Sequence, residues 1–384
     1  MKKEKQYNDL LEPHENIVIE ILFRNKSVQL IDNFSEQQLE GLLNYCRKNG
    51  LAPLLFHRLN NENHPHKKLF KTDYLTTAFR NESLKKHGDE LLSQFRRNSI
   101  TYMPLKGFIL SQLYYSDSSL RPMSDIDILV PPDQIDKTID FLKDMKLTEA
   151  SFDINKLDPT EHHIPLIMYK STPVEIHRSL FPSNVKYNIP VNDIWQHKSS
   201  LNHPIYDIVI DIHQLFIYLT LHIYYTGQRG GLRLSWFYDL LVLIQNNSVQ
   251  EDKLELWINK WKVSLPFSKV ITVLNWLSPE SLPDWLSQYA KTKYYDDIKQ
   301  YIIFFRDSSQ QINYYSYQLI WERLFKTKGF KNKLKFIWQR LSTDPQNPFD
   351  KKPIGSILLR LFRLISNTLK MLWNKTIRII LMVL

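Results

Sequence analysis

Acidic residues alternate with isoleucine at the start of one short apolar run, and this pattern limits what residues 124–130 can form. The run reads Ser-Asp-Ile-Asp-Ile-Leu-Val, with Asp125 and Asp127 two positions apart. In a strand, side chains at i and i+2 project from the same face, so both carboxylates would lie together. Two carboxylates held this close repel each other unless a cation lies between them. The pattern therefore predicts a divalent metal site, since Mg²⁺ prefers oxygen ligands, or else a solvated polar strand end.

Neighbouring segments supply further charges that favour the metal interpretation. Glu175 lies between two apolar residues in a later predicted strand and is the expected third acid. Lys106-Gly107 opens a predicted helix, where Gly107 would let the backbone approach a phosphate and Lys106 would supply charge. Arg121 is expected to reach the same triphosphate with its planar guanidinium, and Ser124 is expected beside it.

Three histidines lie close to these acids in the sequence. His177 follows Glu175 by two positions and is expected on the same strand face, as a possible substrate contact. His162 and His163 are adjacent, and adjacent side chains in a strand face opposite ways, so only one of them is expected to point inward. Because no cysteine and no regular ligand spacing accompanies them, the histidines do not predict a zinc site.

The hydrophobic periodicity predicts an α+β fold in which a small mixed sheet is flanked by helical regions. Ser35 and Gln38 form a capping-box pattern at the start of one helix in the N-terminal region, and Gly50 is a plausible residue to end it. Strand, helix, strand, helix and hairpin follow one another in the middle of the chain. We expect four parts: helical residues 1–99, an α/β core at 100–200, a helical domain at 201–345 and a basic amphipathic tail at 346–384.

The net charge of +10 is concentrated near the C-terminus. Residues 323–384 carry fourteen basic and two acidic residues, so the rest of the chain is close to neutral. This asymmetry indicates a local anionic partner and disfavours a broad nucleic-acid surface. The single cysteine, Cys46, rules out an intramolecular disulfide and suits a reducing compartment. Because the first residues lack the apolar run of a signal peptide, we expect a cytoplasmic protein.

Residues 351–384 contain seven basic residues and no acid. Most of these basic residues fall on one helical face, with leucine, isoleucine and valine on the other. No apolar run approaches 18 residues, so a spanning helix is not expected. The segment is typical of a helix that lies on an anionic membrane surface, which would place the protein at the inner face of the membrane. Packing on the protein itself or on a partner is the alternative.

Three segments, LKGFILSQLYY, RPMSDIDILV and VEIHRSL, together resemble an uncharacterised nucleotidyltransferase family of the DNA polymerase β superfamily. The resemblance extends to LHIYYTGQRGGLRLSWFYDLLVLI and so covers roughly residues 35–244. It implies that Asp125 and Asp127 form the metal-binding and catalytic pair and that Glu175 is the third acid. It also implies that Mg²⁺ or Mn²⁺ is the cofactor and that an NTP is a substrate, with ATP the expected nucleotide.

The resemblance makes His222, Arg233 and Asp239 further candidates for substrate contact. The Lys106-Gly107 pair stands where the wider superfamily has Gly-Gly or Gly-Ser, a departure that bears on triphosphate binding. The implied function is transfer of a nucleoside monophosphate to an unidentified acceptor, in surface polysaccharide or peptide modification. Two alternatives remain open: a toxin–antitoxin-type nucleotidyltransferase that acts on tRNA or protein, and a catalytically idle binding module recruited to a membrane.

Overall fold

The computed structural model describes residues 7, 9–149, 151–154, 161–229, 231–246 and 249–306. These residues form an α+β protein with a small mixed sheet, which confirms the expected fold class. The described residues up to 227 and from 231 onward belong to one compact unit. None of the helices in the described part of the chain has the length and apolar character needed to cross a bilayer. The predicted tail at 346–384 lies outside the described residues.

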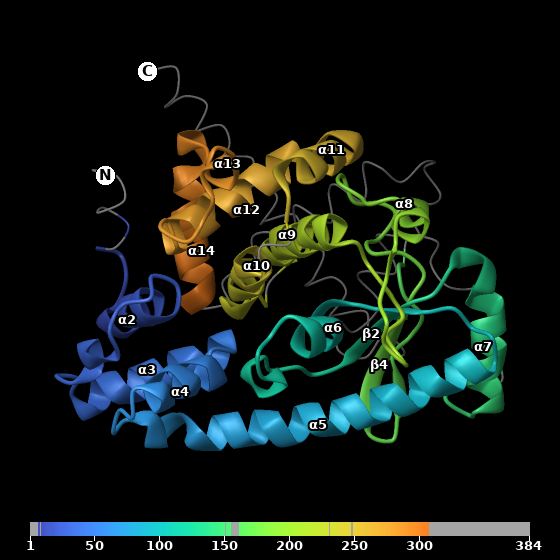
Figure 1. Ribbon diagram of the computed structural model, residues 1–384, viewed down its shortest axis with the longest axis horizontal. Helices are drawn as coiled ribbons and strands as arrows, with labels where there is room; N and C mark the ends of the chain where they lie inside the picture. Colours follow the sequence, from blue (N-terminus) through green and yellow to red (C-terminus); the bar gives the residue numbers. More distant parts are fainter. Residues whose placement is uncertain are drawn as a thin grey trace, which may run out of the picture. The chain divides into compact units, whose positions relative to one another are not determined.

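Helices dominate the described chain (Figure 1). The N-terminal and central helices are α2 (Pro13–Leu22), α3 (Glu36–Asn49), α4 (Ala52–Asn61), α5 (Lys67–Arg97), α6 (Lys106–Leu113), α7 (Ile135–Asp144) and α8 (Val191–Gln196). The later helices are α9 (Ile212–Arg229), α10 (Ser235–Gln245), α11 (Glu251–Trp261), α12 (Ser264–Leu277), α13 (Asp284–Ser287) and α14 (Tyr295–Arg306). The strands are β1 (Met103–Pro104), β2 (Ile126–Leu129), β3 (Ile167–Tyr169), β4 (Thr172–His177), β5 (Ser199–Ser200) and β6 (Ile208–Val209).

The ends of α3 follow from local sequence chemistry. The Ser35 hydroxyl accepts a hydrogen bond from the Gln38 backbone N–H at 3.4 Å, and the Gln38 side chain accepts one from the Ser35 N–H at 2.9 Å. The helix ends at Gly50, whose φ of 69° is a left-handed conformation that glycine adopts without strain. Both predicted caps are therefore confirmed.

The main sheet has the strand order β1-β2-β4-β3 and is mixed. β2 pairs with β1 and β3 with β4 in antiparallel fashion, whereas the central strands β2 and β4 run parallel. One face of the central pair carries the fully buried apolar side chains of Ile126, Ile128, Val174 and Ile176. They belong to the same hydrophobic core as Leu91, Leu92 and Phe95 of α5, the long helix that runs past β2 and β4 in Figure 1. The opposite face is left for the acidic side chains.

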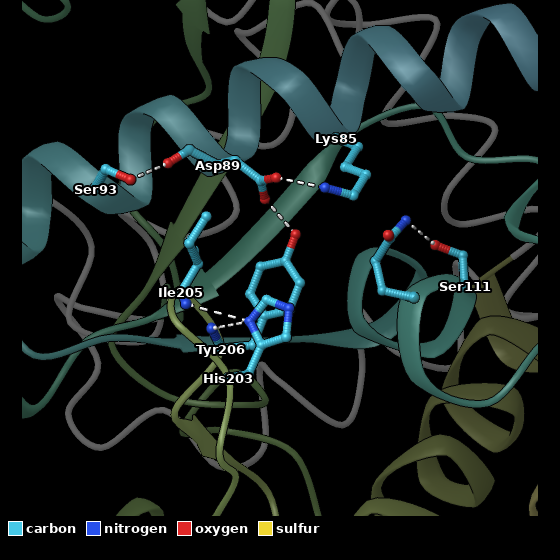
Figure 2. A network of polar contacts seen from close by, with 8 residues as sticks. Lys85, Asp89, Ser93, Ser111, His203, Ile205 and Tyr206 are labelled. Atoms are coloured by element: carbon cyan, nitrogen blue, oxygen red, sulfur yellow. Dashed lines mark hydrogen bonds and ion pairs between the residues drawn. The ribbon is translucent and has the colours of Figure 1, made fainter.

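A polar network fixes the segment before β6 against α5 (Figure 2). The Asp89 carboxylate on α5 accepts hydrogen bonds from Lys85, at 2.6 Å, and from the hydroxyl of Tyr206. Nδ1 of His203 accepts from the backbone N–H groups of Ile205 and Tyr206, and its ring stacks on that of Tyr206 with centroids 4.4 Å apart. This network sets where the chain enters α9.

Polar contacts join the N-terminal helices α2 and α3 to α14, the last described helix. Nδ2 of Asn49 donates to the carbonyl of Phe305 at 3.1 Å, and Oδ1 accepts from the N–H of Leu234 at 3.1 Å. Nearby, the guanidinium of Arg306 binds both carboxylate oxygens of Glu15, which is 1% exposed. Parts of the predicted regions 1–99 and 201–345 are thus joined directly.

Candidate active site

Parallel pairing of β2 with β4 brings two acids side by side. Asp127 lies directly opposite Glu175, and Leu129 lies opposite His177. Paired residues of neighbouring strands project to the same face, so Asp127, Glu175 and His177 share one side of the sheet. Asp125 lies immediately before β2 and is half-buried. Glu175 and His177 thus share a face with Asp127, as expected, while Asp125 precedes the strand.

Asp127 is the centre of a buried charge cluster. Its Oδ1 atom accepts hydrogen bonds from Nζ of Lys106 and from Nε2 of His177, each at 2.8 Å. The same His177 nitrogen lies 3.3 Å from Oε2 of Glu175. His177 is fully buried, whereas the side chain of Glu175 retains 25% of its exposure. One imidazole N–H thus bridges two carboxylates, and the more accessible of the two is Glu175.

The cluster controls how its acids ionise. Burial alone would raise the pKa of Asp127, but the Lys106 ammonium and the His177 hydrogen bond outweigh burial and hold this pKa well below its usual range. Asp125 shows the opposite balance, because burial and then the negative charge of Asp127 raise its pKa. The surroundings therefore favour the charged form of Asp127 and disfavour that of Asp125.

Lys106 reaches Asp127 from an unusual backbone position. Its φ is 44°, in the left-handed region that non-glycine residues seldom adopt, and it begins α6. Leu105 provides no side-chain cap, so the first N–H groups of α6 are available to an anion. Gly107 is required for space as well, since a Cβ there would lie 2.2 Å from Nη1 of Arg121.

Arg121 is engaged by Asp239 of α10 in a buried ion pair. Nε and Nη2 of Arg121 donate to the two carboxylate oxygens of Asp239, each at 2.8 Å. The Tyr115 hydroxyl donates to the same carboxylate at 2.7 Å. The planar guanidinium that was expected at the triphosphate is therefore already bound by Asp239, which was itself expected at the substrate. This pair links α10 to the strand that carries the acids.

The remaining predicted residues have separate surroundings. Ser124 is exposed, and its hydroxyl donates to Oδ1 of Asp125 at 3.2 Å. The ring of His222 packs against that of Trp236, with centroids 4.8 Å apart. Arg233 is exposed just before α10. The structure thus places Ser124 beside Asp125, His222 within α9 and Arg233 just before α10.

Tyr218 of α9 is a residue at the site that sequence reasoning missed. It is fully buried, and its hydroxyl lies near Lys106 without a hydrogen bond of good geometry. Burial raises the pKa of this hydroxyl, with Lys106, Asp127 and Glu175 all within electrostatic range. In the sequence Tyr218 is one of many aromatic and aliphatic residues in an apolar helix, so no local signal marked it.

The expectation that only one of His162 and His163 points inward is wrong. The ring centroids of His162 and His163 lie 5.3 Å and 5.5 Å from that of His177. The chain bends at His162, and only His163 pairs with β4, through an isolated bridge to His177. The alternation of a regular strand therefore does not apply to these two residues.

The donor atoms at the carboxylates suit a divalent ion. Oxygens of Asp127 and Glu175 and a nitrogen of His177 lie within 4.8 Å of one another. Donors about 2.1 Å from a shared octahedral ion are roughly 3 Å apart. The His177 N–H donates to both carboxylates, at 2.8 Å and 3.3 Å, so it is not itself a ligand but keeps their oxygens close enough for one ion. Asp125 adds a further carboxylate beside this set, so the residues present fit the magnesium-type ion that the resemblance implies.

Replacement of Asp125 by asparagine tests whether the negative charge of Asp125 destabilises the metal-free protein and contributes to binding of Mg²⁺. Because the pKa of Asp125 is raised in the folded chain, its charged form lowers the free energy of unfolding at pH values above that pKa. This destabilisation decreases as the pH falls through the raised pKa towards the pKa of the unfolded chain. We expect Asp125→Asn to raise the unfolding midpoint by roughly 2 °C without Mg²⁺ at neutral pH. The variant should also lose the rise that Mg²⁺ produces in the wild type. Thermal unfolding with and without Mg²⁺ measures both effects, and a midpoint below that of the metal-free wild type contradicts this reading.

Comparison with known proteins agrees with this geometry. A family model described as "Uncharacterised nucleotidyltransferase" matches residues 35–279, which include all the acids, Lys106 and α10. Searches of curated proteins and of solved structures found no significant match. The family match thus covers the whole segment that carries the acidic site on the central strands.

Proposed function

The chain belongs to the uncharacterised nucleotidyltransferase family and is a transferase of phosphorus-containing groups, and we propose that it moves a nucleoside monophosphate from an NTP to an acceptor in a Mg²⁺- or Mn²⁺-dependent reaction. ATP is the nucleotide we expect. The observation that carries the proposal is the placement of Asp127 and Glu175 opposite each other on parallel strands, with Asp125 beside them. Surface polysaccharide or peptide modification remains the proposed setting for the acceptor.

Each side chain has a role that its surroundings suit. Asp125, Asp127 and Glu175 would hold the ion, which when bound supplies positive charge to the phosphates of the NTP. Lys106 and the free N–H groups of α6 would bind the triphosphate, with Ser124 at its edge. Glu175 is the most accessible partner of the Asp127–His177 cluster and would accept the proton of the acceptor hydroxyl.

Residues beyond the acids would keep the strands in place. Arg121 and Asp239 bind each other, and the pair would position β2 while Arg121 packs against Gly107. The phosphates would then be contacted by Lys106 and not by Arg121. His177 would hold Asp127 and Glu175 at a fixed separation through its shared N–H. His222 of α9 and Arg233, just before α10, remain proposed contacts for substrate.

One contact favours the alternative of an idle binding module. Lys106 already neutralises Asp127, so this one carboxylate is charge-compensated without a metal ion. An idle module would bind Mg²⁺ and NTP, or neither, but would transfer nothing. The toxin–antitoxin-type alternative shares the site and differs only in acceptor, which is tRNA or protein.

Labelled nucleotides test transfer directly. The full chain is incubated with Mg²⁺, cell extract and each NTP labelled at the α-phosphate or, as the matched control, at the γ-phosphate. We expect label in a macromolecular or lipid-linked acceptor only from the α-labelled NTP, because the transferred group retains that phosphorus. Labelling from the γ-position alone would indicate a kinase, and no labelling from any NTP would favour the idle module. Nuclease and protease digestion of the product then separates the acceptor classes.

The basic tail supplies the proposed location. Residues 351–384 contain seven basic residues and no acid, which suits an anionic membrane surface. The protein would then act in the cytoplasm at the inner face of the membrane. Co-sedimentation with vesicles that contain anionic lipid, compared between the full chain and a chain truncated after Asp350, tests this part of the proposal.

A further inference from the structure

We propose that Glu161, His162 and His163 form a second metal site, separate from the carboxylates of β2 and β4 and selective for a transition metal ion of the Zn²⁺ class. The proposal does not depend on nucleotidyl transfer. It rests on three observations: the separation of the donor atoms, the way the backbone holds them, and the chemistry of the donor set.

The three side chains already bring their donor atoms together. One donor atom from each of Glu161, His162 and His163 lies within 4.8 Å of the others. The two imidazole rings are 4.6 Å apart between centroids and meet edge to face at 74°. All three residues are half-buried, so an ion would be reached from solvent yet partly shielded from it. A small inward movement of the donors closes a site with Zn–N distances of about 2.1 Å.

The backbone of this segment is fixed by hydrogen bonds to the end of β4 and the residue that follows. The Arg178 N–H donates to the carbonyl of His162 at 2.8 Å, and Nε of the same arginine donates to the carbonyl of Glu161 at 2.8 Å. The N–H of Ile164 donates to the carbonyl of Ile176 at 2.9 Å. Three bonds within four residues hold the donors before any ion arrives, which lowers the entropy cost of binding.

One histidine already has the hydrogen bond expected of a metal ligand. Nδ1 of His163 lies 2.8 Å from the carbonyl of Ile164, and it donates its proton there because a carbonyl only accepts. That tautomer leaves Nε2 of His163 with a free lone pair. Metal-bound histidines in proteins commonly donate their other ring N–H to a backbone carbonyl in this way, because the bond fixes the ring and the tautomer.

The donor set separates this site from the carboxylate site. Two imidazoles and one carboxylate suit Zn²⁺ and its neighbours in the first transition row, whereas Mg²⁺ prefers oxygen donors. His177 divides the two sets: its Nε2 is bound to Asp127 and Glu175, while its ring packs against His162 and His163.

Cobalt provides a direct test in the full chain. Metal-free protein is titrated with Co²⁺ in a large excess of Mg²⁺, which occupies the carboxylates and leaves nitrogen donors to the probe. We expect visible absorption bands that saturate at one Co²⁺ per chain and disappear when Zn²⁺ is added. Glu161→Gln and His163→Ala should each weaken Co²⁺ binding by at least about tenfold, the loss that even an outer-sphere partner can cause.

Two matched variants locate the bound ion. His57→Ala removes a half-buried histidine elsewhere in the described chain, and Asp127→Asn alters the carboxylate site; both should bind Co²⁺ as the wild type does. Circular dichroism shows whether each variant is folded. If His163→Ala does not fold, Glu161→Gln, whose side chain has nearly the same shape as that of the wild type, provides the test alone. The proposal is overturned if the wild type shows no saturable bands, or if Asp127→Asn loses them while Glu161→Gln and His163→Ala keep them.

Discussion

Asp127→Asn is expected to reduce nucleotidyl transfer by at least about 10³-fold, which corresponds to roughly 4 kcal/mol of transition-state stabilisation. Asparagine has nearly the same shape but carries no charge and offers one oxygen in place of two. Asp127 is the acid that both Lys106 and His177 contact, and its pKa is held low, so its charge is present at any working pH. Transfer from α-labelled NTP, compared at equal protein and Mg²⁺ concentrations, measures the loss.

A second substitution separates lost chemistry from lost stability. In Asp127→Asn the half-buried ammonium of Lys106 loses its partner, and an uncompensated charge in this position destabilises the fold. Adding Lys106→Met removes that charge, so the double variant should unfold closer to the wild-type midpoint while remaining inactive. If Asp127→Asn keeps more than a tenth of wild-type transfer, the acid does not hold the catalytic ion.

Asp239→Ala is expected to lower the free energy of unfolding by about 3–5 kcal/mol, because it leaves the guanidinium of Arg121 buried and unpaired. Arg121 is 8% exposed and Asp239 is 2% exposed, so water cannot replace the missing carboxylate. The Tyr115 hydroxyl loses its acceptor in the same variant. Denaturant unfolding monitored by circular dichroism measures the change, which is a large share of the stability of an ordinary protein.

The double variant Arg121→Met/Asp239→Leu distinguishes a structural pair from a phosphate-binding arginine. Apolar replacement of both partners removes the desolvation cost as well as the attraction, so most of the lost stability should return. If Arg121 only positions β2, this variant keeps an NTP KM close to that of the wild type. If the double variant is folded but its KM for NTP rises by tenfold or more, Arg121 contacts the triphosphate.

The parts of the site that the sequence predicted are those set by local pattern. Alternation around Asp125 and Asp127 predicted the strand, and the apolar flanks of Glu175 predicted its neighbour, so the shared face followed from period-two geometry. The capping residues of α3 were equally local. In each case the deciding interactions lie within a few residues.

The parts that the sequence did not predict depend on distant or irregular contacts. Arg121 and Asp239 are 118 positions apart, and nothing near either one indicates that it will bind the other. Tyr218 reaches the site only because α9 packs beside the sheet, and a bend at His162 breaks the alternation assumed for the histidines. The division into four parts remains a prediction.

The position of Asn49 has a consequence for how the chain is made. Its side chain binds Leu234 and Phe305, and Arg306 binds Glu15, so the first helices depend on residues synthesised much later. A ribosome adds only about 5–20 residues per second, which leaves α2 and α3 without these partners for many seconds. Asn49 and Glu15 therefore lack their final polar partners during translation, and the protein completes these contacts only after residue 306 has left the exit tunnel.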